Sequence, residues 1–256
     1  MFYGSPSLDQ IIQVVNNNTA RVNQLQTTGA TLSVTGVPPL QCDLAFERPL
    51  RLRLTAGTRI TGNELDLGSN DNVFWFWARR NADPAIYFAR HAEFQSGAVA
   101  EIMPVPPSWI IEALGLVQLT ADESTSGPFP RGNGRLEIRS TGVGPQRNLT
   151  RLIVIDDQRG FVLEQSVYDA QGQLLATAAA SDHQYDATFG VSLPRQIDIQ
   201  LPPAQMAFSI KTSGYLINQL SADGLQLWSM PEKEGYTLID LARFQTSRLS
   251  PAPAMH

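Results

Sequence analysis

The stretch that decides the fold class is Leu40-Gln-Cys-Asp-Leu-Ala-Phe-Glu-Arg-Pro-Leu-Arg-Leu-Arg-Leu54. Apolar residues occupy nearly every second position in it, which is the period of a β-strand with one buried face. If the strand runs unbroken, Pro49 marks an edge position or a bulge within it. Its apolar face then carries Leu40, Cys42, Leu44, Phe46, Leu50, Leu52 and Leu54, together with Arg48.

The segments on either side of this stretch predict a β-rich domain with two helices. Ser7 is suited to cap an amphipathic helix that ends near Thr28-Gly29, and Pro107 and Gly115 bracket an apolar helix over 108–114. Residues 121–148 are rich in loop residues around a short strand at 134–140. Period-two patterns and turn residues predict further strands at 59–67, 73–79, 85–91, 151–155, 161–168, 174–180, 194–201, 205–212 and 225–229. We therefore expect one domain over 1–256, with about ten antiparallel strands in a curved sheet or open barrel and helices packed against it.

The composition excludes several classes of protein. The chain has 256 residues, a net charge of −5 and scattered arginines, which argues against a nucleic-acid partner. Charged residues are 17% of the chain, below the typical value of about 25%, as in many exported bacterial proteins. One cysteine, Cys42, allows no internal disulfide and is expected to be a buried thiol. No apolar run approaches the ~18 residues of a membrane-spanning helix, and no export signal precedes Ser7.

Motifs of catalysis or of cofactor binding are missing from the sequence. It contains no Gly-x-Ser-x-Gly, His-Glu-x-x-His, phosphate-loop or Gly-x-Gly-x-x-Gly pattern. The three histidines are His91, His183 and His256, too few and too scattered to indicate a zinc site. We therefore expect a protein that is not an enzyme and holds no metal or cofactor. The alternative of a hydrolase would need paired carboxylates, for which Glu47, Glu64 and Asp66 are the strand-borne candidates.

Two features suggest a ligand. Arg48 falls on an apolar strand face, where a charge needs a partner, unless Pro49 breaks the register and turns Arg48 to solvent. The strand Val73-Phe-Trp-Phe-Trp77 is aromatic on both faces. Such a strand fits a filled core, but Trp75 and Trp77 on one face would also suit a large apolar cavity.

The order of these elements resembles the LolA/LolB group of lipoprotein-sorting factors of the bacterial envelope. The shared features are an N-terminal amphipathic helix, a strand with Glu47-Arg48-Pro49, a turn at Asp71-Asn72 and the aromatic strand after it. The resemblance covers residues 8–116 by motif, and the rest by strand pattern. It implies an unclosed antiparallel β-barrel, a half-cone of about eleven strands, with a helical lid over a hollow for acyl chains. It also implies that Arg48 bonds to the lid and that the helix over 108–114 is part of that lid.

The resulting functional hypothesis is non-enzymatic binding of lipid acyl chains or lipoproteins by a monomer in the periplasm or at the periplasmic face of the outer membrane. Contact with that membrane would come through an N-terminal lipid anchor missing from this sequence. The alternative is a structural or interaction lipoprotein whose core is filled by its own side chains. We expect the ligand to be lined by Phe46, Arg48, Leu50, Leu52, Trp75, Trp77, Phe88, Trp109, Ile110 and Leu114.

Overall fold

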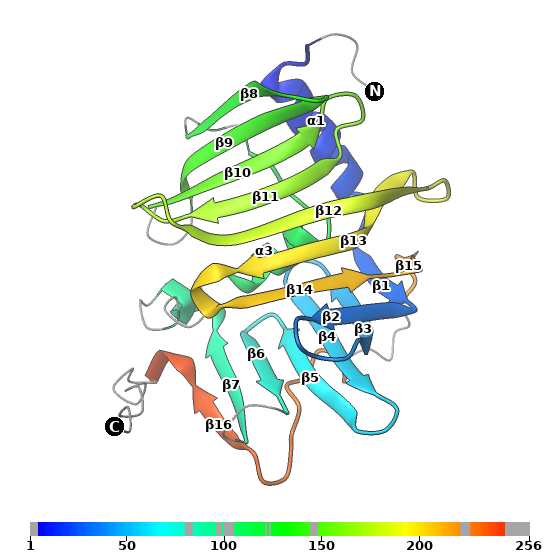
Figure 1. Cartoon of the computed structure of the whole chain (residues 1–256), viewed down its shortest axis with the longest axis vertical. Helices are drawn as coiled ribbons and strands as arrows, with labels where there is room; N and C mark the ends of the chain where they lie inside the picture. Colours follow the sequence, from blue (N-terminus) through cyan, green and yellow to red (C-terminus); the bar gives the residue numbers. More distant parts are fainter. Residues whose placement is uncertain are drawn as a thin grey trace.

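A computed structural model describes residues 5–79, 84–95, 99, 105–120, 122, 124–143, 148–220 and 226–243. Within them sixteen strands form one sheet (Figure 1). The strands of the first half and the last strand are β1 (Gln24–Thr28), β2 (Ala30–Val34), β3 (Leu40–Glu47), β4 (Arg51–Thr58), β5 (Gly62–Ser69), β6 (Val73–Ala78), β7 (Ala85–Arg90) and β16 (Thr237–Asp240). Those of the second half are β8 (Thr125–Gly132), β9 (Arg135–Val143), β10 (Leu149–Asp156), β11 (Val162–Tyr168), β12 (Leu174–Asp186), β13 (Val191–Leu201), β14 (Met206–Lys211) and β15 (Gly214–Ile217).

Five helical segments accompany the sheet in the described residues. They are the α-helices α1 (Leu8–Thr19) and α3 (Pro107–Ala113) and the 3-10 helices η1 (His91–Gln95), η2 (Pro202–Ala204) and η3 (Leu241–Arg243). In Figure 1, α1 and α3 lie on the same side of the sheet, behind the strands in that view. We call this side of the sheet the inner face and the opposite side the outer face.

The sheet consists of two antiparallel meanders joined by two pairs of strands. The main order is β16-β7-β6-β5-β4-β3-β2-β14-β13-β12-β11-β10-β9-β8, so that β2 and β14 connect the two halves. Off this order, β1 pairs with β3 and with β15, which makes the second connection. The ends of this order, β16 and β8, do not pair with each other, and β16 runs parallel to β7. The expected mostly-β class, with an unclosed barrel and a helical lid, is confirmed. The strand count is higher than predicted, and one pair of strands is parallel.

Helix α1 is shorter than the sequence predicted. A capping box starts it: the Ser7 hydroxyl accepts from the Gln10 amide (3.3 Å), and the Ser7 amide donates to Gln10 Oε1 (2.9 Å). The helix ends at Thr19, and the prediction that it continues to near Thr28-Gly29 is wrong. Three asparagines and a threonine are weak helix formers at this end, and Leu25 and Thr27 are buried with the alternation of strand β1 instead.

The decisive stretch is a hairpin, not one unbroken strand. Strand β3 ends at Glu47, residues 48–50 turn, and β4 begins at Arg51. Phe46 pairs with Leu52, and Glu47 with Arg51. Because the turn has three residues, both strands keep even-numbered residues on the inner face, which explains why the alternation passed through the turn unchanged.

The sequence missed β2, whose Ala30 and Leu32 are buried in the middle of the sheet, and it also missed strands at the edges of the sheet. Strand β8 is almost entirely half-buried or exposed and has no apolar alternation, so only its pairing with β9 defines it. The short strands β15 and β16 were also not predicted, and the described residues of the predicted strand at 225–229 form a turn. An edge strand is set by its neighbour's hydrogen bonds more than by its own pattern.

Candidate functional site

The candidate site is the inner face of the sheet beneath helix α3. Strands β2, β3, β4, β12, β13 and β14 contribute a buried apolar cluster that includes Leu32, Leu44, Phe46, Leu52, Leu54, Ile197, Ile199 and Ile210. Helix α3 adds Trp109, Ile111, Ala113 and Leu114 to the same cluster. The prediction of an apolar helix at 108–114 is confirmed by α3, and Gly115, with a φ of +88°, ends it in the left-handed conformation.

Residues 105–119, here called the lid segment, cover the inner face without joining the ladder of the sheet. In the described structure, their backbone–backbone hydrogen bonds all stay within the segment. Asn16 of α1 holds its far end through two hydrogen bonds, from Asn16 Nδ2 to the Leu119 carbonyl (2.8 Å) and from the Leu119 amide to Asn16 Oδ1 (2.9 Å). The rest of the attachment is mainly apolar, with Val117 and Leu119 packed beside Ile11 and Val15 of α1.

One ion pair joins α3 to the sheet. The Glu112 carboxylate on α3 contacts Nη2 of Arg151 on β10, and these side chains are only 25% and 16% exposed. Arg151 Nη2 also donates to Gln165 Oε1 (3.3 Å). Burial raises the pKa of Glu112, and the charge of Arg151 opposes that shift. Two buried donors here, Arg151 Nε and the indole nitrogen of Trp109, have no hydrogen-bond partner in the part of the chain described.

Arg48 clamps the end of α1 to the β3–β4 turn. Its Nη2 donates to the carbonyl of Thr19 and its Nε to that of Val22, each at 2.7 Å. A cation is favourable at this negative end of a helix. Burial lowers the pKa of Arg48. Arg48 therefore neither lies unpaired in the core nor turns away to solvent. Arg48 binds the end of α1, which covers part of the inner face. The resemblance had implied that Arg48 would bond to the lid.

The aromatic strand β6 divides its side chains between the two faces. Phe74 and Phe76 are on the inner face and pack with Ala89 and Leu241. Trp75 and Trp77 are on the outer face, where they form a cluster with Phe88, Ile86, Met230 and Tyr236. Lys233 caps this cluster, its Nζ 3.4 Å from the centre of the Trp77 ring.

A buried carboxylate supports this outer cluster. Asp66 accepts from Arg53 Nη2 (2.6 Å) and from Trp75 Nε1 (3.2 Å). Burial raises the pKa of Asp66, against the opposing effect of Arg53. The indole of Trp75 lies over Gly68, where a Cβ would be 2.1 Å from the ring. This arrangement is structural and lies across the sheet from the lid segment.

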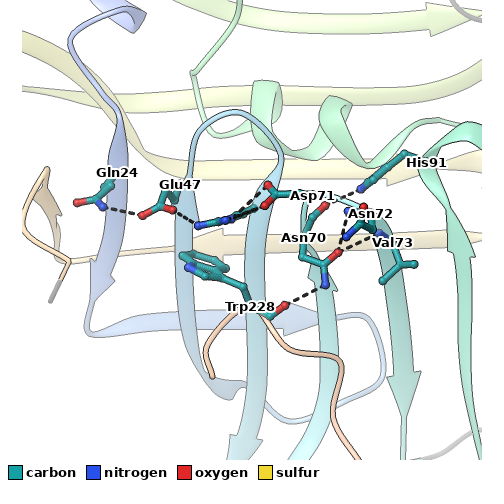
Figure 2. A network of polar contacts seen from close by, with 9 residues as sticks. Gln24, Glu47, Asn70, Asp71, Asn72, Val73, His91 and Trp228 are labelled. Atoms are coloured by element: carbon teal, nitrogen blue, oxygen red, sulfur yellow. Dashed lines mark hydrogen bonds and ion pairs between the residues drawn. The ribbon is translucent and has the colours of Figure 1, made fainter. Parts of the chain in front are cut away.

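A polar network fixes the turns at the end of strands β3 to β6 (Figure 2). Gln24 donates to Glu47 (2.7 Å), and Arg51 bridges Glu47 and Asp71. Beside it, His91 Nε2 lies 2.8 Å from the Asn70 carbonyl, and Asn70 Nδ2 donates to the carbonyl of Trp228 (3.1 Å). Because a carbonyl only accepts, His91 carries its proton on Nε2. The network joins β1, the β3–β4 turn, the β5–β6 turn and the segment that contains Trp228.

The carboxylates named for a hydrolase are engaged in ion pairs. Glu47 pairs with Arg51, Glu64 with Arg79 (3.6 Å) and Asp66 with Arg53 (2.6 Å). Among the described residues, no three His, Cys, Asp or Glu side chains gather closely enough to hold a metal ion. No helix in the described ranges is long and apolar enough to cross a membrane.

The structure brings together half of the ten residues expected around a ligand. Phe46, Leu52, Trp109, Ile110 and Leu114 meet at the inner face. Arg48 and Leu50 lie in the β3–β4 turn, and Trp75, Trp77 and Phe88 lie on the outer face. The sequence analysis missed the pair of Glu112 and Arg151. The available signal was one charge in an apolar helix and one at the start of the apolar run Arg151-Leu-Ile-Val-Ile155.

Comparison with solved structures identifies the class of fold. A domain from Vibrio parahaemolyticus described as an outer-membrane lipoprotein-sorting protein aligns with a TM-score of 0.53 at 9% identity, over 83% of this chain and 94% of its own. A LolA superfamily protein from Nitrosomonas europaea aligns with a TM-score of 0.52 at 8% identity, over 88% and 99%. A DUF1329 family protein from Desulfovibrio piger gives 0.53 at 9% identity, over 87% and 99%.

The protein therefore has a LolA-like fold, and the resemblance read from its motifs is confirmed at the level of the fold. No protein-family model matches the sequence, and no curated protein is significantly similar to it in sequence. The likeness spans 94% to 99% of the three solved chains.

Proposed function

We propose that this protein binds a lipid acyl chain, or the acyl chains of a lipoprotein, between the inner face of its sheet and the lid segment. The observation that carries this proposal is the way in which α3 is attached. Its apolar side chains fill the centre of the inner face, yet its backbone makes no hydrogen bond to the sheet in the described structure. Apolar contacts are non-directional, so an acyl chain can take the place of α3. Each CH₂ group that it buries contributes roughly 0.8 kcal/mol of favourable free energy.

The similar solved structures support the same class of ligand. One solved relative is described as a lipoprotein-sorting domain, and another as a LolA superfamily protein. Binding in a bacterial envelope, by a protein that is not an enzyme, follows from this likeness as part of the proposal. In the closed form seen here, Trp109 and Leu114 are 3% and 1% exposed, so the ligand enters as the lid segment moves away.

The test is a titration with dodecanoate, followed by tryptophan emission and by native mass spectrometry. We expect one or a few acyl chains per protein, and a red shift of the emission because Trp109 leaves the core with the lid segment. Trp109→Phe should bind with a smaller shift. The matched control is Trp228→Phe, which changes a buried tryptophan outside the inner-face cluster and should keep the full shift.

A second function is favoured by how completely α3 fills the inner face. A structural or interaction module with a filled core needs no ligand, and the described cavities measure only about 160, 20 and 260 Å³. If no dodecanoate binds and no lipid co-purifies with protein extracted from bacterial cells, the acyl-chain proposal is wrong and the filled-core module stands.

A further inference from the structure

The ion pair beneath the lid segment constrains the chemistry of the ligand. Arg151 lies on the inner face: its neighbours across the ladder are Val167 and Ser140, and Ile153 follows two residues later on the same face. Ile153 is 1% exposed, and the Arg151 side chain is 16% exposed. Arg151 is thus a cation at the border of an apolar core, with Glu112 of α3 as the carboxylate that neutralises it.

Displacement of α3 removes that carboxylate. Breaking such a largely buried pair by withdrawing one partner leaves an uncompensated charge, which is unfavourable. An uncharged ligand head, such as an alcohol or an ester, would leave Arg151 in this state. A carboxylate or a phosphate would replace Glu112 and restore the ion pair, commonly in the bidentate geometry that a guanidinium favours.

The closed structure already holds one spare donor on the sheet for such a head. Arg151 Nε is buried and has no hydrogen-bond partner among the described residues, although Nη2 is engaged by Glu112 and Gln165. The Trp109 indole N–H is also unpartnered among them, but it lies on α3 and moves away with the lid segment, so only the Arg151 donor remains for the head. Unsatisfied buried donors are rare and favour an incoming acceptor.

From these observations, and resting on the proposed acyl-chain function, we infer that the ligand is an amphiphile with an anionic oxyacid head, and that Arg151 binds this head in place of Glu112. Glu112 then acts as an internal stand-in for the head while the site is closed. The shared chemistry is an oxyanion on an apolar chain. Its source is either the carboxylate of a free fatty acid or the phosphate of a lipid.

The experiment compares dodecanoate, dodecyl phosphate and dodecanol as competitors of a neutral fluorescent probe, N-phenylnaphthylamine, on the full chain. For the wild type we expect both anions to bind about tenfold or more tighter than the alcohol, from one charge-assisted contact. Tighter binding of the phosphate would indicate a phospholipid-type source, and tighter binding of the carboxylate a free fatty acid.

Three variants isolate the charge, and a fourth, Arg139→Gln, is the control. Glu112→Gln removes the internal competitor and should strengthen binding of the anions, whereas a purely structural role would weaken it. Arg151→Gln alone leaves the Glu112 carboxylate without its ion-pair partner, so this variant is compared with the double variant Glu112→Gln/Arg151→Gln. The double variant should bind dodecanol more tightly than the wild type does, because no charge is left without a partner, and it should lose the preference for anions. Arg139→Gln, on the opposite face of neighbouring strand β9 and 51% exposed, should keep the preference.

The outcomes separate this inference from the proposed function. If all three amphiphiles displace the probe equally well from the wild type, acyl-chain binding stands and the role of Arg151 is wrong. A preference for anions that survives in the double variant overturns the role of Arg151 as well. If none of the three displaces the probe or binds, the proposed function fails, and the inference fails with it.

Discussion

Replacing Arg48 by leucine tests how the Arg-Pro turn supports the covering helix. The change removes two hydrogen bonds of 2.7 Å from a charged donor to the carbonyls of Thr19 and Val22. Hydrogen bonds of this kind contribute about 1.5–3 kcal/mol each, and a shared donor makes the two less than additive. We therefore expect Arg48→Leu to lower the free energy of unfolding by about 2–4 kcal/mol. With a urea m-value of about 3 kcal/mol/M, the midpoint should fall by roughly 1 M.

Equilibrium unfolding in urea, followed by circular dichroism, measures this change. Arg48→Lys should show about half of the loss, because an ammonium group can reach one of the two carbonyls more easily than both. The matched control is Arg21→Leu, which removes an exposed arginine whose side chain donates to the Gly190 carbonyl (2.6 Å). Its loss should stay below about 1 kcal/mol. Equal midpoints for Arg48→Leu and Arg21→Leu would show that the hydrogen bonds of Arg48 to the end of α1 contribute no more to stability than an exposed arginine does.

Three further predictions concern stability and reactivity. Gly68→Ala should destabilise the protein by about 2–4 kcal/mol in urea melts, since its Cβ would lie 2.1 Å from the Trp75 ring, whereas Gly214→Ala, with its nearest atom at 3.4 Å, should change stability by less than about 1 kcal/mol. Burial raises the pKa of Cys42 to about 12, so its thiol should react with Ellman's reagent at pH 8 only after unfolding, and rapid labelling of the native protein would contradict this. Burial lowers the pKa of His183 below its usual 6.5, so the unfolded chain binds the proton more readily than the folded chain. The free energy of unfolding should therefore fall as the pH drops through about 6.5. The fall should be smaller in His183→Phe.

The fold class could be predicted because burial on one face imposes its period on the sequence. The alternation from Leu40 to Leu54 predicted a half-buried sheet, and both strands of the hairpin obey it. The apolar run of α3 between Pro107 and Gly115 likewise predicted its own boundaries. These signals are local, since each depends on residues a few positions apart along the chain.

The candidate site was only partly predictable. The alternation of a strand shows which side chains share a face, but it does not show which face of the sheet a helix covers. Trp75 and Trp77 share a face as expected, but their register with β5 and β7 puts it opposite Phe46 and Leu52. The pairing of Glu112 with Arg151 joins residues 39 positions apart, on a helix and on a strand of the other meander. No local pattern encodes such a contact.

Neighbouring residues were enough to predict a mostly-β fold with an amphipathic N-terminal helix and an inserted apolar helix, since periodicity and helix-end residues are local signals. The pairing of β2 with β14, the hold of Arg48 on the end of α1 and the position of Arg151 beneath the lid segment became visible only in the folded chain. Such hydrogen bonds and ion pairs join distant segments, and they depend on the register and twist of the whole sheet.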